Sequence, residues 1–274
     1  MSSETVRATA PKPWSAAVRS WRAVLDTGSF LLPLVLLVVV WGMLKGGLSL
    51  DDDVIASPGA SAAAAWELVR TGVLPAYVSA SIGRLALGAL LAVAVGVPLG
   101  LLLGFTRYGA VMFEPFLRFF QAVSGIAWLP LAIIWFGFTN QTILAVIVYT
   151  AVIPIVFNTM VGVRTIPDVY RQAVATMGGG RARVAWNVFL PGALPSIVVG
   201  VRLGIGYGWR ALIAGEMLVG KSGLGFLIFD ARRFHVLDTI MAGMVMIGAL
   251  YLVVDRLILA SVERLTIQRW GVVR

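Results

Sequence analysis

Six long apolar segments divide this chain, and they constrain its fold more than any other feature of the sequence. A helix needs roughly 20 predominantly apolar residues to cross the hydrocarbon core of a bilayer. A spanning helix also satisfies its own backbone hydrogen bonds where no water is present. The sequence therefore predicts an all-α, polytopic membrane bundle of six transmembrane helices. The predicted spans are residues 29–46, 80–105, 115–137, 141–163, 194–218 and 236–260.

The composition favours a membrane protein and argues against several functional classes. Hydrophobic residues make up 59% of the 274 residues and charged residues only 13%, against about 25% charged residues in a typical soluble domain. In a chain this apolar, the net charge of +9 is expected in loops and ends, not in a nucleic-acid site. With no cysteine and a single histidine, His235, we predict no disulfide, no metal site and no cofactor.

The chain divides into a polar N-terminal segment, a membrane domain and a short tail. Residues 1–28 are polar, residues 29–265 form the predicted membrane domain, and residues 266–274 form the tail. The first apolar run begins too late for an ordinary signal peptide, and no small-residue cleavage site follows it. We therefore expect this run to be retained as the first helix.

The distribution of Lys and Arg predicts that both ends lie in the cytoplasm. Loops on the cytoplasmic side carry an excess of these residues. With the N-terminus inside, the inner side holds twelve of them: Arg7, Lys12, Arg19, Arg22, Arg107, Arg164, Arg171, Arg181, Arg183, Arg264, Arg269 and Arg274. The outer side holds five: Lys45, Arg70, Lys221, Arg232 and Arg233.

A long basic loop separates the fourth and fifth predicted spans. Pro167 can start a helix that runs to about Met177, where three consecutive glycines end it. A second short helix is expected over residues 181–188, ending at Leu190 and Pro191. Two helices this short cannot bury their own apolar residues, so we expect the loop, residues 167–191, to dock on another surface.

The loop resembles the motif of ABC importer permeases, which reads E-A-A, three residues, Gly, nine residues, then I-x-L-P. The matching positions are Gln172, Ala173, Val174, Gly178, Val188, Leu190 and Pro191. Gln replaces the first Glu, so a salt bridge made by that position in the family is in doubt, although docking is not. The stretches AWLPLAIIWFG, LPSIVVGVRLGIGYGW and AGEMLVGKSGLGFLIFDA resemble the nitrate, sulfonate, taurine and bicarbonate branch.

The resemblance extends from about residue 30 to residue 265, and it implies a type I ABC importer permease-like fold without enzymatic activity of its own. In that family the loop is a coupling helix that inserts into the ATP-binding subunit. The implied partners are a dimer of ATPase subunits, a second permease copy in a homodimer, an extracytoplasmic solute-binding protein and membrane lipid.

A second motif points to a different class of protein. Residues 215–222, GEMLVGKS, satisfy the P-loop pattern G-x-x-x-x-G-K-[ST], and Asp255 follows an apolar run as a magnesium-binding aspartate would. A P-loop requires a β-strand before it and a helix after it. Here a membrane segment precedes the motif, Gly223 and Gly225 follow it, and the predicted location is extracellular. We interpret the match as coincidental.

Several charged residues fall within or beside predicted spans. An isolated charge near the bilayer centre costs roughly 2.5–3.5 kcal/mol, so these residues should face protein or water. Arg210 lies near the middle of the fifth span beside Trp209, where a fixed cation would favour anions. The alternative is that Arg210 pairs with a carboxylate or with carbonyl groups and serves packing. We predict Trp128, Trp209, Arg210 and Glu216 as contacts of the translocation path.

The predicted solute is a small anion such as nitrate, taurine or an alkanesulfonate, although members of such families also take up uncharged vitamin precursors. The alternative function is an ATP-independent secondary transporter or channel. The spacing within the loop argues against this alternative, as does the scarcity of carboxylates for proton relays.

Overall fold

The computed structural model describes residues 32–33, 35–47 and 54–259. The predicted N-terminal segment, residues 1–28, and the tail, residues 266–274, lie outside these ranges. The described residues form helices joined by short turns, and no strand occurs among them. The chain divides into two units, residues 1–60 and Ser61–Arg274.

The first unit contains an apolar helix and the start of a second helix. The apolar helix covers Val35–Gly47, so the predicted span 29–46 lies partly outside the described residues. The indole Nε1 of Trp41 donates to the Ala56 carbonyl at 3.0 Å. The Ser57 hydroxyl accepts the Ala60 N–H at 3.1 Å and so caps the start of α2, which runs over Pro58–Arg70.

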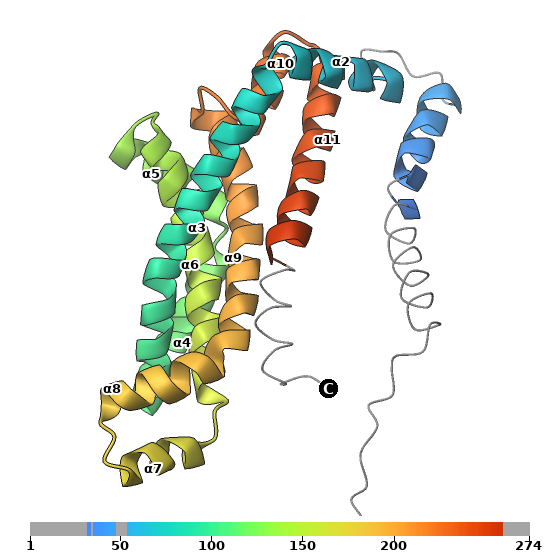
Figure 1. Cartoon of the computed structure of the whole chain (residues 1–274). Coiled ribbons are helices and arrows are strands. Elements are labelled where there is room, and N and C mark those ends of the chain that lie inside the picture. The colour runs from blue at the N-terminus through green and yellow to red at the C-terminus, as the bar shows by residue number, and fades with distance from the viewer. Residues whose placement is uncertain (1–31, 34, 48–53, 260–274) are drawn as a thin grey trace, which may run out of the picture. The chain divides into compact units, whose positions relative to one another are not determined.

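Three long helices form the centre of the second unit. They are α3 (Val73–Phe105), α6 (Asn140–Arg164) and α9 (Leu190–Val219), and α6 packs extensively against both of the others (Figure 1). The elements that follow α9 are α10 (Leu224–Arg233), α11 (Leu237–Val253) and a π-helical turn, Val254–Leu259.

Small residues allow α3 and α6 to approach closely. The face of α3 that carries Gly88, Gly96, Gly100 and Gly104 lies against side chains of α6. A Cβ added at Gly100 would lie 2.5 Å from the Thr159 Cβ and 2.8 Å from the Val156 carbonyl oxygen. Because lipid provides no hydrophobic drive for helix association, close contact of this kind supplies the packing energy.

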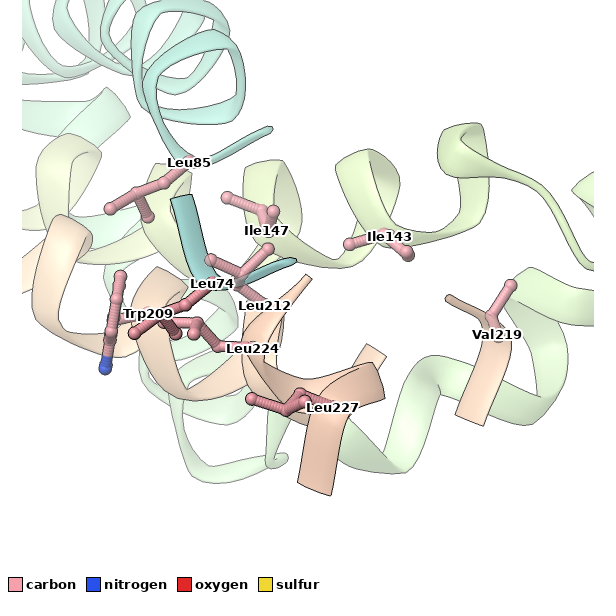
Figure 2. Packing of buried hydrophobic residues seen from close by; sticks show 9 residues of the cluster. All are labelled: Leu74, Leu85, Ile143, Ile147, Trp209, Leu212, Val219, Leu224 and Leu227. Carbon is pink, nitrogen blue, oxygen red and sulfur yellow. The ribbon is translucent and has the colours of Figure 1, made fainter. Parts of the chain in front are cut away.

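A buried hydrophobic cluster joins α3, α6 and α9 to the short helix α10. Figure 2 shows its nine members: Leu74, Leu85, Ile143, Ile147, Trp209, Leu212, Val219, Leu224 and Leu227. Ile143, Leu212 and Leu224 have no exposed surface. The cluster holds the short helix α10 against the ends of the long helices.

The predicted third span, residues 115–137, is not one straight helix. It consists of α4 (Arg107–Ala122), a 3-10 turn (Gly125–Trp128) and α5 (Leu129–Phe136), with an 84° bend between the helical parts. Gly125 is buried against Thr150, whose Cβ would lie 3.1 Å from a Cβ at residue 125. The helical parts separate at this glycine, whereas Pro130 lies in the first turn of α5, where its missing N–H costs no hydrogen bond.

Four helices of the described residues are long and apolar enough to cross a membrane: Val73–Phe105, Asn140–Arg164, Ala182–Val219 and Leu237–Arg256. The bent pair of α4 and α5 gives a fifth if it crosses as one span. The predicted all-α membrane bundle is confirmed. The predicted third span differs from a regular helix because it is bent between α4 and α5.

Candidate coupling loop and membrane cavity

The predicted coupling loop forms a helix and a tight turn at the end of the bundle opposite α10 (Figure 1). Its first helix, α7, covers Asp168–Thr176. Gly178 adopts a φ of 75°, a left-handed conformation that side-chain-bearing residues rarely adopt. The N–H of Gly179 then donates to the Val174 carbonyl at 2.9 Å. The glycines therefore end α7 and reverse the chain, as the sequence predicts.

The outward face of α7 has no partner within the described residues. Gln172, Ala173 and Gly178 are exposed, and Met177 is 82% exposed. Val174 alone among these motif positions of α7 is partly buried, against a cluster at the base of the loop. The helix thus presents an exposed surface to a partner while one side chain anchors it to the bundle.

The second half of the loop continues directly into the fifth span, so the predicted helix end at Leu190 and Pro191 is wrong. Residues Arg181–Val184 are α-helical, Ala185–Phe189 form a π-helical turn, and α9 starts at Leu190. The Leu190 N–H donates to the Ala185 carbonyl, which places Pro191 in the first turn of α9. A π-turn before this proline allows the helix to pass a residue that has no N–H to donate.

The base of the loop is fastened to the spans by a second buried cluster. Val163 of α6, Val184 and Phe189 of the loop, and Ala193 and Ile197 of α9 form it. Phe105 at the end of α3 contacts Phe189 edge to face, with ring centroids 5.4 Å apart. Val188 and Leu190 pack against the same cluster. A displacement of the loop would therefore act directly on three long helices.

A cavity of about 330 Å³ opens beside the break between α4 and α5. Its polar lining comes from Gln121, Ser124, Tyr149, Thr150, Tyr207 and Arg210. Phe120, Ile126, Ile153 and Pro154 contribute much of the apolar lining. The guanidinium carbon of Arg210 lies 5.4 Å from the centroid of the Tyr207 ring, a cation–π contact that orients the charge.

The structure brings together only part of the predicted path set. Arg210 lines the cavity, and Trp128 lies next to it, with its ring 5.1 Å from that of Tyr149 and 6.4 Å from that of Phe120. Trp209 instead is 5% exposed and packs against Tyr251 in the cluster of Figure 2. Tyr149, Thr150 and Tyr207 were not predicted, although each is a polar residue inside an apolar run.

Glu216 lies apart from the cavity in a buried polar network. Its carboxylate has no exposed surface and accepts hydrogen bonds from the Ser81 hydroxyl at 2.9 Å, from Arg84 Nη1 at 2.6 Å and from the Gly225 N–H at 3.0 Å. Arg84 also donates to the carbonyl of Ser222 at 2.8 Å and to its hydroxyl at 2.9 Å. The network joins α3, α9 and the start of α10.

This network also explains the P-loop look-alike. Residues 215–219 are the last turn of α9, and residues 220–223 form the turn that leads into α10. No strand precedes the motif among the described residues. Gly223 adopts a φ of 112°, and a Cβ there would collide with the Glu216 carboxylate. Within this turn Ser222 accepts hydrogen bonds from Arg84, and Gly223, which follows the motif, leaves room for the Glu216 carboxylate, so the segment surrounds an ion pair and not a phosphate.

A further charged pair links the fifth and last spans. Arg202 of α9 makes a two-pronged contact with Asp255, with Nε to Oδ1 at 3.0 Å and Nη2 to Oδ2 at 2.9 Å. The two residues belong to different helices and lie 53 positions apart in the chain.

Comparison with known proteins shows which family the chain resembles. Residues 96–267 match the family described as "Binding-protein-dependent transport system inner membrane component". The fold also matches an inward-facing structure of the MetNI methionine ABC transporter, with a TM-score of 0.52, 21% identity and coverage of 72% of this chain and 96% of that chain.

Among curated proteins, the chain is similar to the taurine transport system permease protein TauC of Escherichia coli (34% identity, 69% of each chain). It is also similar to the nitrate import permease protein NrtB of Synechocystis (34%, 69% of this chain and 68% of the relative). A third relative is the bicarbonate transport system permease protein CmpB of Synechococcus elongatus (35%, 70% and 67%). The chain therefore belongs to the family of binding-protein-dependent transport system inner membrane components, the permeases of ABC importers.

Proposed function

We propose that this chain forms the solute path of an importer and that a separate ATPase subunit drives it through residues 167–191. The observation that carries this proposal is the exposed helix α7, which ends in a glycine turn and rests on a cluster shared with α3, α6 and α9. A partner that binds α7 and changes shape on ATP hydrolysis would displace the ends of these helices. The chain itself then needs no catalytic residue.

The proposed orientation puts α7 on the cytoplasmic side, where ATP is available. The excess of Lys and Arg in the loops at that end supports it. A second permease copy, two ATPase subunits and an extracytoplasmic solute-binding protein complete the proposed assembly, which lies in a bacterial inner membrane with both termini in the cytoplasm.

The proposed path passes the cavity that Arg210 lines, with Trp128 beside it. We leave Trp209 and Glu216 out of the path, because both are buried and occupied by other contacts. The solute we propose is a small anion. Arg210 supports this, since a fixed cation at a cavity attracts negative charge, and relatives named for taurine, nitrate and bicarbonate support it too.

Gly179→Ala is expected to uncouple ATP hydrolysis from the solute. A Cβ at residue 179 would collide with Val174 Cγ1 and lie 2.7 Å from the Val174 carbonyl oxygen, which accepts the bond that closes the turn. The turn must then open, and α7 loses its position. We expect solute-stimulated ATPase activity of the reconstituted complex to fall several-fold.

Gly180→Ala is the matched control, because a Cβ at that position meets nothing within 4 Å. It should leave coupled ATPase activity near the wild-type value. Equal activity of the two variants, with the complex intact, would contradict the proposed role of the turn. Uptake without any ATPase subunit would instead favour an ATP-independent channel or secondary transporter.

A further inference from the structure

Helix α4 touches both features of the proposed mechanism, the cavity and the base of the coupling loop. Its last residues line the cavity, and an ion pair joins its middle to the end of α6, from which the loop continues. We propose that Glu114 is a positioning residue that makes α4 follow the coupling loop, so that a displacement of the loop changes the cavity. This inference rests on the proposed function and adds to it the route from the loop to the solute.

Apolar packing contributes little to the position of α4. Among the residues of α4 whose side chains the structure describes, Ala110 alone is buried. No residue of α4 belongs to the buried hydrophobic clusters of the described residues. Most of its large apolar side chains are exposed: Val111, Met112, Phe113, Phe116 and Phe119. The contacts that tie α4 to α6 must therefore come largely from polar groups.

The Glu114 carboxylate joins α4 to the last residue of α6. Its Oε2 accepts a hydrogen bond from Arg164 Nη1 at 3.4 Å, and its Oε1 accepts from Arg118 Nη2 at 2.8 Å and from Arg118 Nε at 3.2 Å. Arg118, one turn along α4, thus holds the carboxylate in the orientation that reaches Arg164. The loop begins at Pro167, three residues after Arg164, so Glu114 fastens α4 at the base of the loop.

Two further contacts continue along α4 towards the cavity. The guanidinium carbon of Arg118 lies 5.4 Å from the centroid of the Phe157 ring of α6, which is a cation–π contact. The Tyr149 hydroxyl of α6 donates to the Phe120 carbonyl at 3.1 Å, and both of these residues line the cavity. Contacts between the two helices therefore extend from the base of the loop to the cavity, and Glu114 makes the one nearest to the loop.

An ion pair of this kind can determine which arrangement of a bundle is populated without holding the fold together. The side chain of Glu114 is 30% exposed and that of Arg164 is 40% exposed, and exposed ion pairs contribute little to stability. A conformational equilibrium, however, responds to any contact that is made in one arrangement and not in the other. Loss of the Glu114 carboxylate should therefore release α4 from the loop and leave the unfolding temperature unchanged.

The test follows α4 and the loop separately in the permease complex in lipid nanodiscs, with a cysteine-free ATPase subunit and the solute-binding protein. Because the permease has no cysteine, a fluorophore sensitive to its surroundings can be attached at a single site. Met112→Cys places it on the exposed face of α4, and Gly180→Cys places it in the loop, where a Cβ meets nothing within 4 Å. Fluorescence is compared between the nucleotide-free complex and the complex trapped with ATP and vanadate. We expect both sites to respond when Glu114 is present.

Glu114→Gln should reduce the response at residue 112 at least about twofold, the shift expected from the loss of a partly exposed ion pair, and leave the response at residue 180 unchanged. Arg164→Gln should have the same effect, because it removes the other member of the same link. Glu67→Gln removes an exposed carboxylate that pairs within its own helix, so it should change neither response.

The possible failures of this test are distinguishable. An undiminished response at residue 112 in Glu114→Gln, or no response there in the parent chain although residue 180 responds, would overturn this inference and leave the proposed function intact. A Glu114→Gln variant that loses both responses, or that unfolds at a clearly lower temperature than Glu67→Gln, would show a role in docking or stability and would also overturn it. A parent complex in which residue 180 does not respond would contradict the proposed coupling through the loop itself.

Discussion

Glu216→Gln is expected to lower the thermal unfolding midpoint of the solubilised permease much more than the loss of an exposed carboxylate. Removing one member of a buried ion pair costs about 3–5 kcal/mol, because the remaining charge stays buried without compensation. In a chain of this size that corresponds to a shift on the order of 10 °C. Arg84, with only 11% of its side chain exposed, would lose its carboxylate, and the neutral amide would bind the Ser81 hydroxyl and Gly225 N–H less strongly.

Glu67→Gln is the control for this prediction. Glu67 of α2 makes an exposed contact with Arg70 at 3.9 Å, and such surface pairs contribute little. Its unfolding midpoint should match that of the wild type. A Glu216→Gln variant as stable as Glu67→Gln would show that the network does not hold α10 in place.

Gly100→Ala is expected to separate α3 from α6. The added methyl group would overlap the Thr159 Cβ and the Val156 carbonyl oxygen, and this carbonyl belongs to a helix backbone that cannot move locally. Overpacking of this kind typically costs about 1–3 kcal/mol. Thermal unfolding of the solubilised chain should therefore occur at a clearly lower temperature.

The same substitution elsewhere on α3 separates packing from helix propensity. Gly83 lies on an exposed face, and a Cβ there meets nothing within 4 Å. Alanine is the better helix former by roughly 0.5–1 kcal/mol, so Gly83→Ala should be neutral or slightly stabilising. If Gly100→Ala behaved in the same way, the close contact of α3 and α6 would not be the source of their stability.

The features predicted from the sequence are those that local chemistry determines. Long apolar runs become helices because lipid leaves the backbone no other partner, and α3, α6 and α9 follow. The run Gly178–Gly180 likewise predicts the turn after α7. In each case the residues that carry the signal are neighbours in sequence.

The features that the sequence did not reveal depend on contacts between distant residues. Thr150 of another helix packs against Gly125 at the break between α4 and α5. The helix passes Pro191 because a π-turn precedes it. Glu216 was predicted for the path because a charge in a span looks functional, but its partners Ser81 and Arg84 lie 135 and 132 residues away in the chain. Trp209 packs against Tyr251 of another helix. The residues next to Trp209 in the sequence give no sign of this contact.

The most direct test of the importer proposal is uptake of radiolabelled 2-aminoethanesulfonate, nitrate or bicarbonate into proteoliposomes that contain this permease, its ATPase subunit and external binding protein. We predict uptake of at least one of these solutes only when ATP is enclosed with the ATPase subunit, and loss of that uptake in Gly179→Ala but not in Gly180→Ala. Uptake that proceeds without the ATPase subunit or without ATP would contradict the proposal and identify the chain as an autonomous transporter or channel.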